Sequence, residues 1–190
     1  MPELLPIFVN LAGRRVLLVG AGPVGAAKLA SLLAAGAEVT VVAPDIHADI
    51  ERAEKEGTIT VWRRRFSPAD LNGVWLVVAA ATPEANREVA DAAGARCVFV
   101  NAVDDPPNAT AYLSGVVRRD GVTLAISTRG DAPGLAGLLR EALDEVLPAD
   151  LGAWMDEARQ QRVIWRRDKV PMAERRPLLL QALNRLYEGR

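Results

Sequence analysis

The sequence is almost without the side chains that form disulfides and zinc sites. Its 190 residues include 1 cysteine and 1 histidine. A single cysteine excludes an intrachain disulfide and fits a reducing compartment. One cysteine and one histidine do not supply an ordinary zinc site, so we expect no metal held by side chains. Cys97 lies in the apolar run RCVFVN and is predicted to be a small buried core residue, whereas His47 is predicted to lie on the surface at a helix start.

A strong charge of one sign and long apolar runs are also absent. The formal net charge is −1, which excludes a molecule whose whole surface binds nucleic acid. Residues 151–190 hold nine Lys and Arg against five Asp and Glu, which fits either an anionic ligand or a solvated helix face. No apolar run approaches the ~20 residues of a membrane span, and the start MPELLPIFVNL is unlike a secretory signal. We therefore expect a cytoplasmic protein that binds neither nucleic acid nor membrane.

From residue 15 the sequence alternates short β-branched apolar runs with alanine-rich amphipathic ones. This alternation is typical of an α/β fold. The short runs are apolar at every position, so both faces of their sheet must be covered, which indicates a parallel sheet flanked by helices. The expected strands are 15–20, 38–43, 58–62, 74–81 and 96–102, and the expected helices are 23–36, 46–56 and 83–94.

The alternation stops at Asp104. Two candidate antiparallel strands follow, 110–117 and 122–128, joined by the tight-turn sequence RRDG. Helices are then predicted at about 133–146, 151–166 and 171–187. We therefore expect three parts: an α/β domain over 1–104, a small α+β segment over 105–147 and a helical C-terminal domain over 148–190.

The turn after the first expected strand carries the sequence VGAGPVG. Gly20, Gly22 and Gly25 have G-x-G-x-x-G spacing between a strand and a helix, as in Rossmann-like dinucleotide-binding sheets. Gly20 would permit the tight turn, and Gly22 would let the backbone approach a pyrophosphate. Gly25 would let the helix pack close to the strand. The alternative is a tight strand–helix turn that binds no ligand.

In such sheets the acid that binds the adenosine ribose follows the glycines by about 20 residues, at the end of the second strand. That strand ends in VVAPDIH, so the nearest candidate is Asp45, one position past Pro44 and therefore displaced. The segment contains no arginine or lysine that would hold a 2′-phosphate. NAD is therefore favoured over NADP as the cofactor.

Two adjacent acids, Asp104 and Asp105, follow the fifth expected strand. Aspartates favour such positions because their side chains bond local backbone amides, so both can be plain turn residues. Their position favours a second interpretation, since the carboxyl ends of parallel strands share one rim of the sheet with the glycine turn. A carboxylate beside a nicotinamide ring is placed to remove a proton while hydride leaves the neighbouring carbon.

Four segments occur in an order and at spacings that resemble a known family: LPIFVNLAGRRVLLVGAGPVGAAKLASLLAAGAEVTVVAP, VVAAATPEANREVADAA, VNAVDDP and LAISTRGDAPGLAGLLREALDEVLP. Together they resemble the dehydrogenase/ferrochelatase part of siroheme synthase, the precorrin-2 dehydrogenase family. The resemblance runs from about Leu5 to Pro148 and more loosely through the helical tail. It implies NAD⁺-dependent oxidation of precorrin-2 to sirohydrochlorin and, as in some members, insertion of Fe²⁺ as a second substrate to give siroheme.

The resemblance also implies roles for residues. The family's catalytic aspartate follows an N-x-V-D run, which here selects Asp104 and leaves Asp105 without a matching role. A homodimer joined through 110–146 and a tetrapyrrole substrate are implied as well. The cofactor contacts fall on Pro23, Val24, Pro44, Asp45, Ala81 and Thr82, beside the three glycines Gly20, Gly22 and Gly25.

The chain departs from the family pattern in one turn. Where Ser-Thr-Gly-Gly with a later Ser-Pro is common, it reads Ser-Thr-Arg-Gly-Asp-Ala-Pro, with Arg129 and Asp131 as the charged departures. Substrate contacts in that turn stay open. The arginines of the tail could bind substrate carboxylates or lie on solvated helix faces. Two other functions also stay open: a redox-sensing module that binds NAD without catalysis, and a small oxidoreductase that acts on a carbonyl or alcohol.

Overall fold

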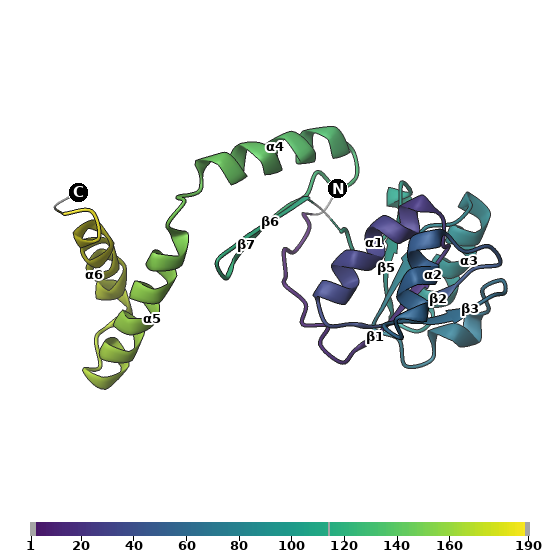
Figure 1. Cartoon of the computed structure of the whole chain (residues 1–190), viewed down its shortest axis with the longest axis horizontal. Helices are drawn as coiled ribbons and strands as arrows, with labels where there is room; N and C mark the ends of the chain where they lie inside the picture. The colour runs from purple at the N-terminus through teal and green to yellow at the C-terminus, as the bar shows by residue number, and fades with distance from the viewer. Residues whose placement is uncertain (1–2, 114, 189–190) are drawn as a thin grey trace. The chain divides into compact units, whose positions relative to one another are not determined.

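A computed structural model describes residues 3–113 and 115–188. The chain divides into two compact units: residues 1–113 with 129–132 form the first, and residues 114–128 with 133–190 form the second. The first unit holds the parallel sheet, and the second holds a hairpin and three helices (Figure 1). The domain limits expected from the sequence, after residues 104 and 147, stay a prediction.

The first unit is built on a five-stranded sheet in the order β3-β2-β1-β4-β5, with every neighbouring pair parallel. Each strand lies within its expected range, and the predicted Rossmann-like α/β class is confirmed. The order reverses between β1 and β4, so the crevice beyond their carboxyl ends is the switch point where ligands bind in such sheets. The strands are β1 (Arg15–Val19), β2 (Glu38–Val42), β3 (Thr60–Trp62), β4 (Leu76–Ala79) and β5 (Phe99–Ala102).

Both faces of this sheet are covered, as its uniformly apolar strands require. On β1, Val16 and Leu18 belong to the core cluster that includes residues of two helices, α1 and α2, whereas Leu17 and Val19 belong to the cluster that includes residues of α3. Leu18 is 0% exposed, so the middle of the sheet is inaccessible to solvent. The helix bounds are α1 (Pro23–Ala34), α2 (Ala48–Lys55) and α3 (Pro83–Gly94).

One buried acid secures the segment between β3 and β4. Asp70 lies in the short 3₁₀ helix η1 (Pro68–Leu71) and is 8% exposed. Its carboxylate accepts hydrogen bonds from the Arg64 guanidinium at 2.6 and 2.8 Å and from the Ser67 N–H at 2.9 Å. Burial raises the pKa of Asp70, but these hydrogen bonds outweigh it, so the pKa lies below its usual value.

The second unit begins with the antiparallel hairpin of β6 (Gly115–Arg119) and β7 (Val122–Ile126). Asp120 and Gly121 both have positive φ, 49° and 84°, as the primed turns of tight hairpins require. The Arg119 guanidinium donates to the backbone and side chain of Asp144, which holds the hairpin against α4. Ser114, inside the expected strand 110–117, lies outside the described residues. Three helices complete the unit: α4 (Pro133–Val146), α5 (Leu151–Arg167) and α6 (Met172–Arg185).

Cys97 is exposed, so its prediction as a buried core residue is wrong. Its backbone has φ 55° and its N–H donates to the Gly94 carbonyl in the turn that closes α3. The strand β5 begins two residues later, at Phe99. The apolar run therefore starts outside the sheet. Among the described residues no helix combines the length and the apolarity that crossing a membrane requires.

Candidate functional site

Gly20 directly follows β1 and has a backbone conformation that favours glycine. Its φ is 96°, and a Cβ at this position would lie 2.2 Å from the carbonyl oxygen of Ala80. Ala80 follows β4, so the backbone after β1 and the backbone after β4 are too close at the switch point for a side chain on Gly20. The tight turn predicted for Gly20 is present.

Gly25 and Gly22 differ in what surrounds them. A Cβ on Gly25 would lie 2.3 Å from the Gly20 carbonyl oxygen, so this glycine lets α1 pack against the end of β1. A Cβ on Gly22 would meet nothing within 4 Å. The protein's own packing therefore requires Gly20 and Gly25 but not Gly22. Open space over the Gly22 backbone fits a ligand that approaches this turn closely.

The first turn of α1 provides groups that attract an anion. Pro23 opens the helix, and the first internal hydrogen bond runs from the Ala26 N–H to the Gly22 carbonyl. The Val24 and Gly25 amides precede that bond and point out of the helix end, where the helix dipole is positive. The first turn contains no acidic residue. A phosphate or pyrophosphate fits these groups.

The end of β2 lies beside the glycine turn. The Gly20 N–H donates to the Val42 carbonyl at 3.0 Å, and the His47 N–H donates to the Ala21 carbonyl at 2.9 Å. Pro44 and Asp45 are therefore held next to the turn, and both are exposed. His47 caps α2, because its Nδ1 accepts from the Asp49 N–H at 3.3 Å.

Three arginines that the sequence did not connect with this region, Arg63, Arg64 and Arg65, follow β3. The Ala43 N–H donates to the Trp62 carbonyl, so the residues after Trp62 lie alongside the end of β2. Arg63 forms two hydrogen bonds with the Glu54 carboxylate, and Arg64 is bound to Asp70. Arg63 and Arg64 are therefore bound to carboxylates of the protein. In the β2–α2 loop itself, next to the glycine turn, the charged residue is Asp45.

The end of β4 carries Ala81 and Thr82 into α3. Thr82 is the N-cap of the helix, and its hydroxyl accepts from the Ala85 N–H at 3.4 Å. Asn86, one turn into α3, is 4% exposed, and its Oδ1 accepts from the Ala81 N–H at 3.0 Å. Asn86 therefore fixes the loop between β4 and α3.

Asp104 lies at the tip of a loop that folds back onto β5. The chain returns so that Thr110 and Ala111 donate their N–H groups to the Val100 carbonyl, at 2.9 and 2.8 Å. The Thr110 hydroxyl also accepts from the Val100 N–H at 2.8 Å. Asp104 itself has φ 54°, an uncommon conformation for a residue with a side chain. Its side chain is exposed.

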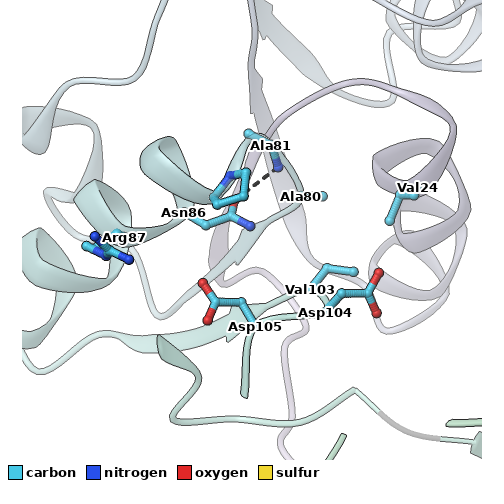
Figure 2. Close-up of a pocket in the computed structure, with 9 residues that line it drawn as sticks. Val24, Ala80, Ala81, Asn86, Arg87, Val103, Asp104 and Asp105 are labelled. Carbon is cyan, nitrogen blue, oxygen red and sulfur yellow. Dashed lines mark hydrogen bonds between the residues drawn. The ribbon is translucent and has the colours of Figure 1, made fainter. Parts of the chain in front are cut away.

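The first turn of α1, the β4–α3 loop with the start of α3, and the loop after β5 line an open cavity of about 410 Å³. Figure 2 shows the Asp104 carboxylate pointing toward the side of Val24, whereas the Asp105 carboxylate points toward Asn86 and Arg87 of α3. The acid at the end of β5 and the first turn of α1 therefore border the same space. The lining residues are Val24, Ala80, Ala81, Pro83, Asn86, Arg87, Val103, Asp104 and Asp105.

The cavity contains three of the residues expected from the sequence and two polar ones that were not expected. Val24, Ala81 and Asp104 line it, whereas the other expected site residues lie outside its lining. Asn86 and Arg87 were missed. Asn86 is a polar side chain on the buried face of α3. The signal available in the sequence was its helical spacing from Val89 and Ala93, which places an asparagine on the apolar face.

The Ser-Thr-Arg-Gly turn also reaches the acidic loop. Residues 129–132 belong to the first unit, and a Cβ on Gly130 would lie 2.9 Å from Cγ of Pro106. Gly130 and Arg129 have positive φ, 86° and 59°. Gly130 and Pro106 therefore lie side by side, although they belong to different segments of the family resemblance. Within the described ranges no cluster of three or more His, Cys, Asp or Glu could hold a metal ion.

A glycine turn at the switch point of a parallel sheet, with an acid across the crevice, defines a dinucleotide-binding protein of the Rossmann type. The family model described as "Putative NAD(P)-binding" matches residues 7–115. The chain belongs to this family.

The chain is also similar to named relatives. It is 44% identical over 157 residues to siroheme synthase 1 of Cronobacter sakazakii, which covers 82% of this chain and 33% of that protein. It is 38% identical over 183 residues to the siroheme synthase of Photorhabdus laumondii, which covers 96% of this chain and 39% of that protein. The chain thus spans well under half the length of these relatives.

Among solved structures, the chain is similar to "SirC, precorrin-2 dehydrogenase", with a TM-score of 0.70 and 25% identity. The match covers 94% of this chain and 88% of that one. The resemblance to the dehydrogenase/ferrochelatase part of siroheme synthase is confirmed.

Proposed function

We propose that the protein is an NAD-dependent dehydrogenase that oxidises precorrin-2 to sirohydrochlorin in siroheme biosynthesis. One observation carries the proposal: Asp104 and the first turn of α1 line a single cavity at the switch point of the sheet. The similarity to siroheme synthases and to SirC supports this choice of substrate.

The residues present fit a dinucleotide. In this proposal the first turn of α1, with Gly22, Pro23 and Val24, binds the pyrophosphate, and Asp45 binds the adenosine ribose. Bound NAD⁺ would supply the hydride acceptor. In this proposal Ala81, which lines the cavity, contacts the cofactor, with Thr82 next to it at the start of α3.

Asp104 is the proposed general base. Two hydrogens leave the macrocycle: one departs as hydride, and the Asp104 carboxylate takes the other as a proton from the neighbouring atom, so that a double bond forms between the two. The carboxylate is exposed to the cavity and points toward the α1 side, which is where a nicotinamide attached to that pyrophosphate would extend.

Insertion of Fe²⁺ is a further part of the proposal. Iron would be a substrate here, since the macrocycle nitrogens ligate it, and Asp104 could take the pyrrole protons that the metal displaces. The same carboxylate would then serve both reactions.

A homodimer is also proposed, with the second copy covering one face of α4. Leu135, Leu138, Leu139, Leu143 and Val146 are exposed on this helix and recur at helical spacing, which makes a continuous apolar stripe. This stripe lies within the segment 110–146 expected to join the subunits.

The decisive experiment is anaerobic incubation of the protein with enzymatically made precorrin-2 and NAD⁺, followed by absorbance for sirohydrochlorin and NADH. A parallel reaction with NADP⁺ tests the cofactor, and later addition of Fe²⁺ tests chelation. NAD⁺ binding without any turnover of precorrin-2 would contradict the proposal and favour a redox-sensing module.

A further inference from the structure

Arg87 contributes an unpaired positive charge to the cavity. It lies in the second turn of α3, lines the cavity and is exposed. Within the described part of the chain no carboxylate pairs with it, in contrast to Arg63 and Arg64, which are bound to Glu54 and Asp70. A guanidinium left without a protein partner at the edge of a cavity is available to an anionic ligand.

Among the described ion pairs, no acid of α3 is bound to Arg87. Glu84 lies one turn earlier, and its pKa is lowered first by a hydrogen bond from its own backbone N–H and then by the Thr82 hydroxyl. The charge of Arg87 acts on Glu84 only as a minor influence. Asp105 points toward the α3 side, but its Oδ2 accepts from the Asn108 side chain at 2.8 Å.

The position of Arg87 indicates which anion it meets. The phosphates of a dinucleotide belong at the first turn of α1, and a 2′-phosphate would belong at the end of β2. Val24 marks the α1 side of the cavity, and Arg87 lies on the other side, with Asn86 and Asp105 between them in Figure 2. A ligand group that reaches Arg87 is therefore part of the second substrate, beyond the reacting atoms at Asp104.

We propose that Arg87 binds a peripheral carboxylate of the tetrapyrrole substrate and thereby orients the macrocycle over Asp104. This inference rests on the proposed function, because it takes the substrate to be a polycarboxylate. Guanidinium and carboxylate form two parallel hydrogen bonds, so the contact fixes direction as well as distance. Arg87 is a substrate-binding residue and takes no part in proton or hydride transfer.

The test compares Arg87→Ala and Arg87→Lys with Arg96→Ala. Arg96 follows α3, is exposed, and among the described residues donates only to the Ala92 carbonyl. Arg96→Ala therefore removes an equal charge outside the cavity lining. Loss of one charge-assisted contact should raise KM for precorrin-2 about tenfold in Arg87→Ala, with kcat and the Kd of NAD⁺ changed less than twofold. Arg87→Lys should recover part of the loss, and Arg96→Ala should match the wild type.

Binding of sirohydrochlorin, followed by its absorbance without turnover, separates this inference from the proposed function. If the wild type binds sirohydrochlorin about tenfold more tightly than Arg87→Ala but shows no turnover, the dehydrogenase proposal fails and the role of Arg87 stands. If the wild type turns over and Arg87→Ala keeps its KM, the inference is wrong. A loss of NAD⁺ affinity in Arg87→Ala with unchanged KM for precorrin-2 would likewise overturn it.

Discussion

Replacing Asp104 with asparagine removes one negative charge from the cavity and almost nothing else. Asparagine is isosteric with aspartate and adopts positive φ about as readily, so the backbone at 54° should not change. Among the described residues no hydrogen bond or ion pair holds the Asp104 side chain. The free energy of unfolding should therefore change by less than about 0.5 kcal/mol.

The effect on catalysis should be large by comparison. A general base typically contributes 10²–10⁴-fold, so Asp104→Asn should lower kcat for NADH formation by about that factor, or about 3 to 5 kcal/mol in activation free energy. NAD⁺ affinity should stay within twofold, because the proposed pyrophosphate site lies on α1. The assay is anaerobic NADH formation from precorrin-2, with NAD⁺ titrated separately by fluorescence.

Asp105→Asn is the matched control, since it removes an equal charge from the same cavity. The Asp105 carboxylate accepts from Asn108 and points away from the α1 side, so this variant should keep kcat within about fivefold. An Asp104→Asn variant that retains the full rate would refute the assignment. Equal losses in both variants would show that total charge, rather than a base at one position, is what the reaction needs.

Three further predictions concern the glycine turn, a buried acid and the core. Gly22→Ala should weaken NAD⁺ binding about tenfold at unchanged Tm, whereas Gly20→Ala should lower the free energy of unfolding by at least about 2 kcal/mol. Equal stability of the two variants would contradict the different surroundings of the two glycines. The lowered pKa of Asp70 gives stability that is present above its unfolded pKa of ~3.9 and lost as pH falls through the folded value. Asp70→Asn should therefore lessen the fall of Tm as the pH drops below about 4. Leu18→Ala should cost about 2–5 kcal/mol in urea unfolding, and a cost below 1 kcal/mol would contradict a dry sheet centre.

Element type was predictable from the sequence because local signals and burial agreed. The helix expected over 83–94 has these limits in the structure, since Thr82 caps it and Pro83 occupies its first turn. The helix expected over 133–146 likewise begins at a proline. The strands of the parallel sheet were predicted too long, by up to four residues for 74–81, because apolar residues continue past the last parallel pairing. The strand expected over 110–117 was misplaced, since β6 begins at Gly115 and ends at Arg119.

The polar lining of the cavity was only partly predictable. The family resemblance implied Val24 and Ala81, and both the resemblance and the position after the fifth strand indicated Asp104. Whether Asn86 and Arg87 line the cavity depends on which face of α3 turns toward β5. Hydrophobic periodicity predicts the buried face of a helix but not which segments lie beside the edges of that face. The prediction that Cys97 is buried failed for a related reason. The first two residues of the apolar run RCVFVN belong to the turn after α3, which the length of the run did not reveal.

The backbone at Asp104 decides which of the two acids faces the Val24 side of the cavity. Along β5, Val100 and Ala102 pack in the core on the α3 side, whereas Val103 packs in the core on the side of α1 and α2. Continued alternation would turn Asp104 toward α3 and Asp105 toward α1. In Figure 2 the order is reversed: Asp104 points toward the Val24 side and Asp105 toward α3. The positive φ of Asp104 interrupts the alternation at that residue, so this turn, rather than the strand, places Asp104 with the glycine turn.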